Sequence, residues 1–280
     1  MPLESAPQPN SATRTICTVS DPTFWPWPTL LAGLLVSLGA GVVRGFAGFG
    51  YSALTVAGLS LFVAPATIVP AVLSLEVLAS LSMWRSALRE ADRSWLGWLL
   101  AGNLVFIPVG IGLLAWLPPT ELRLVVGLTL LVAAVLMRLA GSRRFAPTRR
   151  LQAGAGLASG LLNGMTASGG VAAAMLLTAA GVPAAALRAT MVSMLFFAGL
   201  YALLCAALMP HGQGTGLLTM DTLRWGLLLA PAMLAGISLG RRAFAHIDAG
   251  SFRRHVLTLL IVIAALGTLR AASQLAALGA

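Results

Sequence analysis

Three charged side chains lie within long apolar stretches of this 280-residue chain: Arg44, Glu76 and Arg188. A charge inside a lipid bilayer costs about 2.5–3.5 kcal/mol on insertion scales, so each of these needs a partner or a water-filled cavity. An arginine in such a place can bind an anion, and a carboxyl group can carry a proton or pair with an arginine. The structural alternatives are that Arg188 snorkels from a helix end and that Glu76 forms a permanent ion pair. The pattern alone leaves both interpretations open.

Glycine-rich segments interrupt the apolar stretches at residues 45–50 and 164–170. A helix that begins inside a membrane exposes unpaired backbone N–H groups and the positive end of its dipole. Glycine allows an anion to approach that backbone, and the two helix starts are predicted at Gly50 and Gly169. The alternative is that the small residues only let helices pack closely. Besides Arg44 and Arg188, the residues predicted to bind an anion are Gly48, Phe49, Gly50, Ser52, Asn163, Thr166, Ser168, Gly169 and Gly170.

Other chemistry is poorly supported. The spacing of His211, His246 and His255 matches no metal motif, and neither cysteine accompanies them. Glu76 is the only carboxylate expected deep in the apolar stretches, so the paired acids of hydrolysis are missing. We therefore predict no enzyme, no cofactor and no metal. Most of the arginines cluster in short loops between apolar runs, which argues against a nucleic-acid partner.

The composition determines the class of element that must hold these residues. Hydrophobic residues make up 58% of the chain and charged residues 9%, with a mean hydropathy of +0.91. A soluble domain has roughly a quarter charged residues. The apolar runs are long enough for helices of about 20 residues and are apolar on every face, unlike barrel strands. The sequence predicts an all-α polytopic membrane protein with about 8–10 helical segments.

The arginines also predict the orientation in the membrane. They gather at residues 85–93, 141–150 and 241–254, whereas residues 117–120 and 210–220 have none. Cytoplasmic loops carry the excess of arginine, so the first three segments should be cytoplasmic and the other two external. Single helices are predicted over the apolar runs 95–116, 121–140, 222–240 and 255–272. We expect a multi-pass protein of the cell (cytoplasmic) membrane with an external N-terminus.

The two halves of the chain repeat one another. Gly41-x3-Gly45-x4-Gly50 is echoed by a second glycine series at positions 160, 164 and 169, and a proline follows each series. Each series divides its region into pieces of about 12 to 17 residues, short for a full span. The halves begin on opposite sides, which predicts an inverted repeat with the site at its interface. Each half would be a glycine-broken helix pair followed by three longer helices. The predicted divisions are a polar, largely disordered external segment at 1–27, a repeat at 28–140, a cytoplasmic linker at 141–151 and a repeat at 152–275.

The glycine segments resemble the signatures of a known family. Residues 41–50 resemble the first signature of the sulfite exporter TauE/SafE family. Residues 160–164, 168–170 and 187–190 are similar to its repeated signature, and the likeness covers roughly residues 28–275. The chain departs from the family pattern at residues 171–174, where many members have a proline. The resemblance implies export or uptake of small sulfur oxyanions or organosulfonates.

These observations lead to two hypotheses from different classes. The first is a secondary transporter of small anions, most of all sulfite, related sulfur oxyanions or organosulfonates, working by alternating access around a site near the membrane midplane. Its partners would be the anion, the lipid bilayer and coupled protons or other ions, because no ATP-binding motif is present. The second is a membrane-embedded structural or assembly protein without transport. The sequence leaves a homo-oligomer and the direction of transport open.

Overall fold

The computed structural model describes residues 27–60, 62–63, 65–139, 146, 148–208 and 218–246. The predicted external segment, except Trp27, and the helix predicted at 255–272 lie outside the described residues. Within them, every regular element is an α-helix, which confirms the predicted class. The helices are α1 (Trp27–Ala47), α2 (Tyr51–Leu59), α3 (Pro65–Glu90), α4 (Arg93–Trp116), α5 (Pro119–Leu139), α6 (Arg149–Thr166), α7 (Gly169–Ala179), α8 (Ala184–Leu208) and α9 (Met220–His246).

Five of these helices are long and apolar enough to cross a membrane. They lie at 27–47, 65–84, 93–116, 184–208 and 220–243. Helices α4 and α5 match the predicted single helices to within two residues, whereas α9 begins two residues before the predicted helix and ends six residues after it. Helices α1 and α6, with 21 and 18 residues, are longer than the predicted 12–17, because α1 continues through Gly41 and Gly45 and α6 continues through Gly160 and Gly164.

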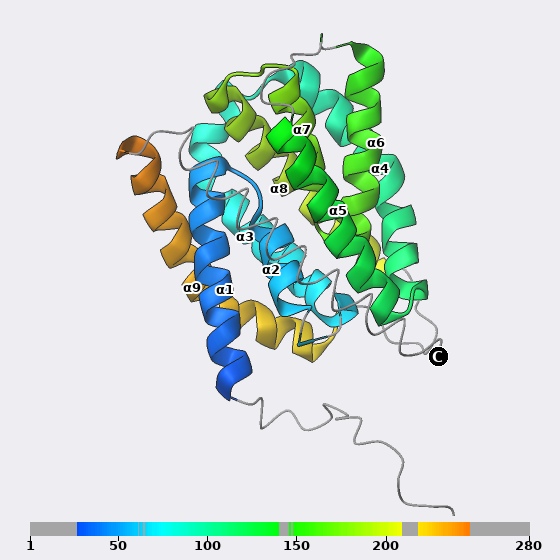
Figure 1. The fold of residues 1–280 in the computed structure, drawn as a ribbon, viewed down its shortest axis with the longest axis vertical. Helices are drawn as coiled ribbons and strands as arrows, with labels where there is room; N and C mark the ends of the chain where they lie inside the picture. Colours follow the sequence, from blue (N-terminus) through cyan, green and yellow to red (C-terminus); the bar gives the residue numbers. More distant parts are fainter. Residues whose placement is uncertain are drawn as a thin grey trace, which may run out of the picture.

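Polar caps start α4 and α6. The carboxylate of Asp92 accepts hydrogen bonds from the backbone N–H groups of Ser94, at 2.9 Å, and Trp95, at 3.1 Å. The hydroxyl of Thr148 accepts one from the N–H of Leu151 at 3.3 Å. Such caps satisfy N–H groups that have no partner inside the helix. In Figure 1 the capped start of α6 lies toward the top, as do the arginine-bearing ends of α3 and α9, whereas α1 and α9 begin toward the bottom.

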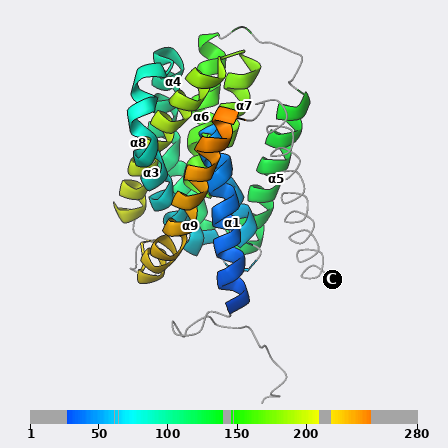
Figure 2. The ribbon, with the colours of Figure 1, turned by 90° about the vertical axis from the view of Figure 1, so that its left-hand side faces the viewer.

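Two pairs of helices pack through glycine, with their backbones in direct contact. Helix α1 lies against α9, as Figure 2 shows, and α4 lies against α6. A Cβ atom added at Gly45 would lie 2.3 Å from the carbonyl oxygen of Ile237, and one at Gly240 would lie 2.1 Å from that of Val42. A Cβ atom at Gly160 would lie 2.7 Å from the carbonyl oxygen of Gly102. These glycines therefore serve close helix packing.

The order and pairing of helices are similar in the two halves. A long helix, a short helix and two long helices follow one another as α1 to α4 and again as α6 to α9. The first helix of each half packs against the fourth helix of the other, α1 with α9 and α6 with α4. Helices α3 and α8, the third of each half, pack against each other.

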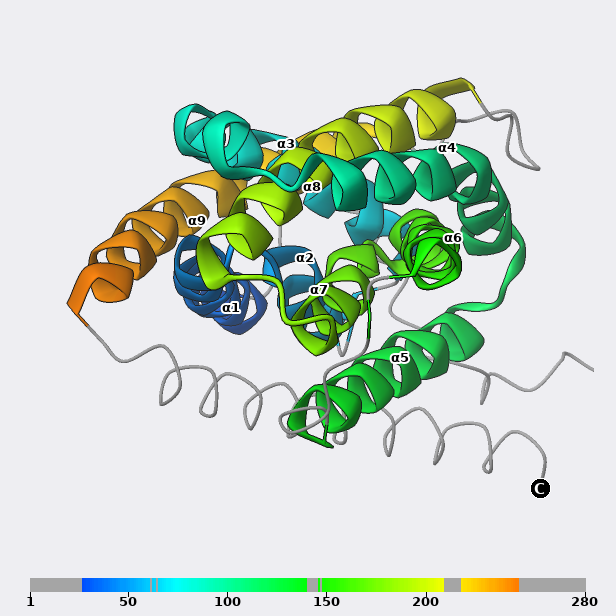
Figure 3. The same ribbon diagram turned by 90° about the horizontal axis from the view of Figure 1, so that it is seen from above.

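The two short helices lie in the middle of the molecule. Seen from above in Figure 3, α2 and α7 lie between α1 and α6, with α3 and α8 along one side and α5 along the other. Helix α5 packs against both short helices. Every residue of α2 is buried, and so are most residues of α7. The fold thus places both glycine breaks, which precede these helices, inside the protein.

Candidate functional site

The first break has a backbone that glycine alone adopts easily. Helix α1 ends at Ala47 and α2 begins at Tyr51, as predicted from the glycine pattern. Gly48 and Gly50 have φ angles of 82° and 94°, in the region where a Cβ atom is strained. No side chain caps the first turn of α2. The start of this buried helix therefore presents N–H groups and the positive end of its dipole to its surroundings.

Arg44 lies one turn before this break and is fully buried, with 0% of its side chain exposed. Its Nη1 lies 2.9 Å from Oε1 of Glu76 on α3, and Glu76 is 1% exposed. Its Nη2 donates a hydrogen bond to the hydroxyl of Ser80 at 2.6 Å, one turn further along α3. Nη1 also donates to the carbonyl oxygen of Gly48. The guanidinium thus joins α1, the break and α3.

The ion pair is incompletely satisfied. Apart from the contact with Arg44, neither carboxylate oxygen of Glu76 accepts a hydrogen bond, and Nε of Arg44 has no acceptor. Most buried polar atoms in proteins have a hydrogen-bond partner, so such exceptions point to strain or function. A buried pair gains little stability over apolar packing. Its retention here favours a functional role.

Arg188 approaches the same break from α8. Its Nη2 donates to the carbonyl oxygen of Gly45 at 2.7 Å. Its aliphatic part packs on Gly48, where an added Cβ atom would lie 2.6 Å from Cγ of Arg188. Arg188 and Glu90 supply the charge in a cavity of about 60 Å³ between the end of α3 and the start of α8. A site for one water needs about 10–15 Å³ by this measure, so the cavity has room for several waters or a small anion.

The second break is built differently. Helix α6 ends at Thr166, and Ala167 takes the left-handed conformation with φ 53° before α7 begins at Gly169. A non-glycine residue there is uncommon and stores strain. The hydroxyls of Thr166 and Ser168 lie 2.5 Å apart. No side chain caps α7 either, and Nδ2 of the buried Asn163 has no hydrogen-bond acceptor. The Thr166 hydroxyl also donates to the carbonyl oxygen of Leu162 at 2.9 Å, so the uncommitted donor at this break is the amide of Asn163, where the first break has Arg44.

Helix α8 contacts both breaks, and the positions of these contacts show how far apart the breaks lie along the α8 axis. Gly48 faces Arg188, whereas a Cβ atom added at Gly170 would lie 3.1 Å from Cδ1 of Leu195. The two contacts are seven residues apart on α8, which corresponds to about 10 Å at 1.5 Å per residue. The structure therefore brings the predicted site residues into two groups. Gly45 and Gly164 pack against neighbouring helices, and so does Gly169, where a Cβ atom would lie 2.1 Å from the carbonyl oxygen of Ser159.

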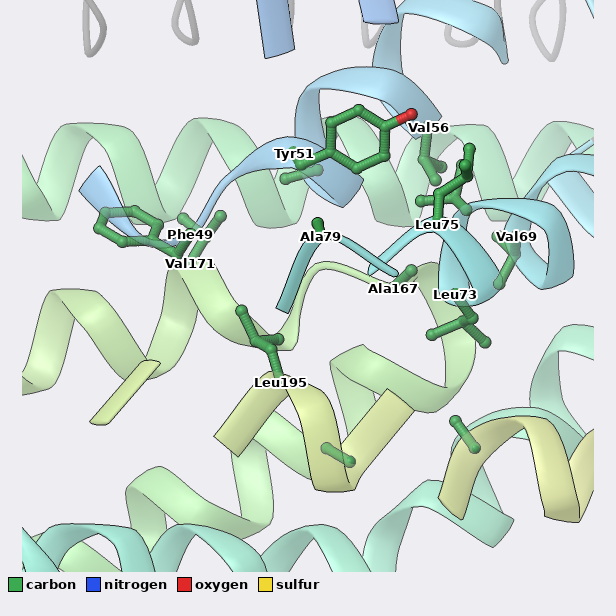
Figure 4. Packing of buried hydrophobic residues seen from close by; sticks show 14 of the residues in the cluster. Phe49, Tyr51, Val56, Val69, Leu73, Leu75, Ala79, Ala167, Val171 and Leu195 are labelled. Carbon is green, nitrogen blue, oxygen red and sulfur yellow. The ribbon is translucent and has the colours of Figure 1, made fainter. Parts of the chain in front are cut away.

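The first group holds Arg44, Glu76, Arg188 and Gly48, with Phe49, Gly50 and the buried Ser52 adjoining along the chain. The second holds Asn163, Thr166, Ser168, Gly169 and Gly170. Figure 4 shows buried side chains from both breaks, including Phe49, Tyr51, Ala167 and Val171, around Ala79 of α3. All five belong to one continuous hydrophobic cluster. In this conformation apolar packing thus surrounds the polar groups of both breaks.

Three polar residues near the breaks escaped the sequence analysis. Ser80 holds Arg44, and its signal is its spacing of four residues from Glu76, which puts both on one face of α3. The amide of Asn103 on α4 donates to the hydroxyl of Ser159 on α6 at 3.3 Å. Asn103 could have been singled out because it is an amide in an apolar run without charges, but nothing in the sequence predicts its contact with α6. Among the described residues, no three His, Cys, Asp or Glu side chains lie together as a metal site would require.

Taken together, the breaks offer a buried guanidinium, two uncapped helix starts, and amide and hydroxyl donors. This set can bind an anion. A family model described as "Sulfite exporter TauE/SafE" matches residues 33–266, which includes both breaks. No curated protein and no solved structure matches the chain.

Proposed function

The chain belongs to the sulfite exporter TauE/SafE family, a family of membrane transporters, and we propose that it is a secondary transporter of small anions. Its proposed substrates are sulfite, related sulfur oxyanions or organosulfonates. Secondary transport is proposed because the sequence has no nucleotide-binding motif, so an ion gradient or the gradient of the anion drives the flux.

The observation that carries this proposal is the guanidinium of Arg44 at the uncapped start of a buried helix. An arginine inside the membrane is expensive, and functional sites are where such residues are kept. Each uncapped helix start contributes roughly half a positive charge, so the start of α2 favours an anion beside Arg44 and the start of α7 favours one at the second break. Arg188 would receive the anion at the cavity beside the first break. Asn163, Thr166 and Ser168 would supply neutral donors at the second break.

We further propose that the two halves are inverted repeats with the site at their interface near the membrane midplane. The exchanged pairing of α1 with α9 and α6 with α4 supports this relation. Glycine-broken helices at matching positions are typical of transporter sites. In the present conformation apolar side chains surround both breaks, so the anion gains access only when the helices around the breaks move. Each glycine-packed pair, α1 with α9 and α4 with α6, joins one half to the other, so each pair would move as a unit.

The test is flux of sulfite, and of an alkanesulfonate that is a monoanion at every working pH, in proteoliposomes made with the purified protein at neutral pH. Flux should exceed that of empty liposomes, and Arg188→Gln should lower it about tenfold, the effect of losing a charge-assisted hydrogen bond. Arg224→Gln is the matched control, because Arg224 is half exposed and pairs with Asp221 at the start of α9. It should leave the flux unchanged. If neither sulfite nor an alkanesulfonate crosses, the structural or assembly protein becomes the better hypothesis.

A further inference from the structure

We propose that Glu76 carries the coupling proton, and that a proton on Glu76 and a substrate anion at Arg44 replace the Arg44–Glu76 ion pair together. This inference rests on the proposed transport function and names its coupling ion. The inference is based on the buried ion pair beside the start of α2, in which Nη1 of Arg44 lies 2.9 Å from Oε1 of Glu76.

The position of Arg44 does not depend on Glu76. The hydroxyl of Ser80 and the carbonyl oxygen of Gly48 both accept hydrogen bonds from the guanidinium, and both acceptors are neutral. If Glu76 loses its charge, these two bonds still hold the guanidinium beside the break. The guanidinium of Arg44 then has no ionic partner and can bind an anion. The N–H groups at the uncapped start of α2 lie close to Arg44 along the chain and can bind the same anion.

Charge balance couples the two events. In the ion pair, the positive Arg44 and the negative Glu76 cancel. With a monoanion bound and Glu76 protonated, the total is again zero. A bound anion beside an ionised Glu76, or a protonated Glu76 with no anion, leaves a net charge buried among apolar side chains, which is strongly unfavourable. Binding of the anion and binding of the proton therefore favour each other to the same extent, as linkage requires.

Among the side chains that the structure describes, Arg44 is the only charged group that contacts Glu76. Helix α1 contributes Arg44, and α2 contributes Tyr51, whose hydroxyl lies 3.0 Å from that of Ser37. From α8, Arg188 lies beyond Arg44 and bonds to the carbonyl oxygen of Gly45. The remaining titratable side chains described on the helices that pack against α3 are Tyr201 and Cys205 on the outer half of α8, and, near helix ends, Glu121, Arg123, Arg149, Arg150, Asp221, Arg224, Arg241 and Arg242.

The proposed step is a simple transfer. A proton from the solution to which the site is open adds to a carboxylate oxygen of Glu76, and the ionic contact with Arg44 breaks. The anion then takes that contact. When the site opens to the other side, the anion leaves, the proton returns to water and the ion pair forms again. One proton moves with each monoanion in the same direction, so the flux follows the product of the two gradients.

Calorimetry with sulfite as the probe tests this step. The purified protein binds sulfite in two buffers of different ionisation enthalpy, and the difference in heat gives the protons taken up per bound anion. Sulfite itself titrates near neutral pH, so wild type is compared with Glu76→Gln, which mimics the protonated carboxyl. Wild type should take up about one proton more than the variant, and its Kd relative to the variant should rise by up to about tenfold per pH unit. Glu121→Gln, on the exposed first turn of α5, is the matched control and should behave as wild type.

The outcomes are decisive. Equal proton uptake by wild type and Glu76→Gln, with both binding sulfite, would overturn the coupling role and leave the transport function intact. Failure of wild type to bind or transport sulfite would count against the proposed function itself. Glu76→Gln leaves Arg44 unpaired, so sulfite should raise its Tm more than that of wild type and should rescue a variant that folds poorly. A Glu76→Gln protein that sulfite neither stabilises nor binds would also overturn the inference.

Discussion

Replacing Gly45 with alanine should loosen the contact between α1 and α9, whereas the same change at Gly39 should not. Both glycines lie on α1, and both changes add one methyl group. A Cβ atom at Gly45 would lie 2.3 Å from the carbonyl oxygen of Ile237, whereas one at Gly39 would meet nothing within 4 Å. The pair of variants therefore separates helix packing from every other effect of the substitution.

The size of the effect follows from these distances. Ordinary van der Waals contact begins near 3.4 Å, so α9 must retreat by about 1 Å to admit the methyl group. Overpacking of this kind costs about 1–3 kcal/mol. Alanine is favoured over glycine inside a helix by about 1 kcal/mol, and this gain is common to both variants. Gly39→Ala should thus be stabilised by up to about 1 kcal/mol, and Gly45→Ala should be less stable than Gly39→Ala by about 1–3 kcal/mol.

The measurement is unfolding by SDS in mixed detergent micelles, followed by circular dichroism. The second half offers the same comparison, because Gly160 faces the backbone of α4 while Gly154 on α6 faces open space. Gly160→Ala should be less stable than Gly154→Ala by a similar amount. If Gly45→Ala is as stable as Gly39→Ala, α1 and α9 do not pack as closely as described, and the close-packing role of this glycine series is wrong.

Three further predictions concern the breaks and the orientation. Arg44→Gln and Glu76→Gln should each destabilise the protein by about 3–5 kcal/mol, because each leaves a buried charge without its partner. The double variant should recover most of that loss in the same SDS assay, and additive losses would speak against the pair. Asn163→Leu should lower sulfite flux in proteoliposomes about tenfold by removing a donor, and unchanged flux would place the substrate away from the second break. In a cysteine-free background, a cysteine at Thr219 should react with a membrane-impermeant maleimide in intact cells and one at Thr148 only after lysis; the reverse labelling would invert the topology.

Much of the secondary structure follows from the sequence, because lipid leaves the backbone few alternatives. Apolar run lengths predict α4, α5 and α9, and the glycine pattern predicts that helices begin beside Gly50 and Gly169. Helices α1 and α6 are longer than the glycine pattern predicts. Glycine weakens an isolated helix, but Gly41, Gly45 and their counterparts on α6 pack against a partner backbone and do not interrupt their own helix. Which helices approach each other in this way depends on tertiary packing that no local pattern contains.

The candidate site divides in the same manner. Residue type and spacing select Arg44, Glu76 and Arg188, because a charge in an apolar run is costly and needs a partner or a function. Whether Arg44 faces Glu76 or a substrate depends on how α1 crosses α3, and in the structure it faces Glu76. Ser80 was missed because a serine in a helix is unremarkable until its neighbour is known. The offset of the two breaks along α8 likewise depends on the packing of α8 and has no signal in the spacing of the glycines.

The difference between the halves matters as much as their likeness. Arg44 precedes Gly45 as Asn163 precedes Gly164, so the two proposed repeats carry a cation and an amide at corresponding positions. A second arginine there would bury another positive charge and require another carboxylate, whereas an amide adds hydrogen-bond donors at no cost in charge. One guanidinium matched by one carboxylate can exchange its partner for a single anion and a single proton. In the proposed mechanism, the repeated helices supply the shape of the pathway, and the pair of Arg44 with Glu76, which has no charged counterpart in the second repeat, determines what is carried and what is coupled to it.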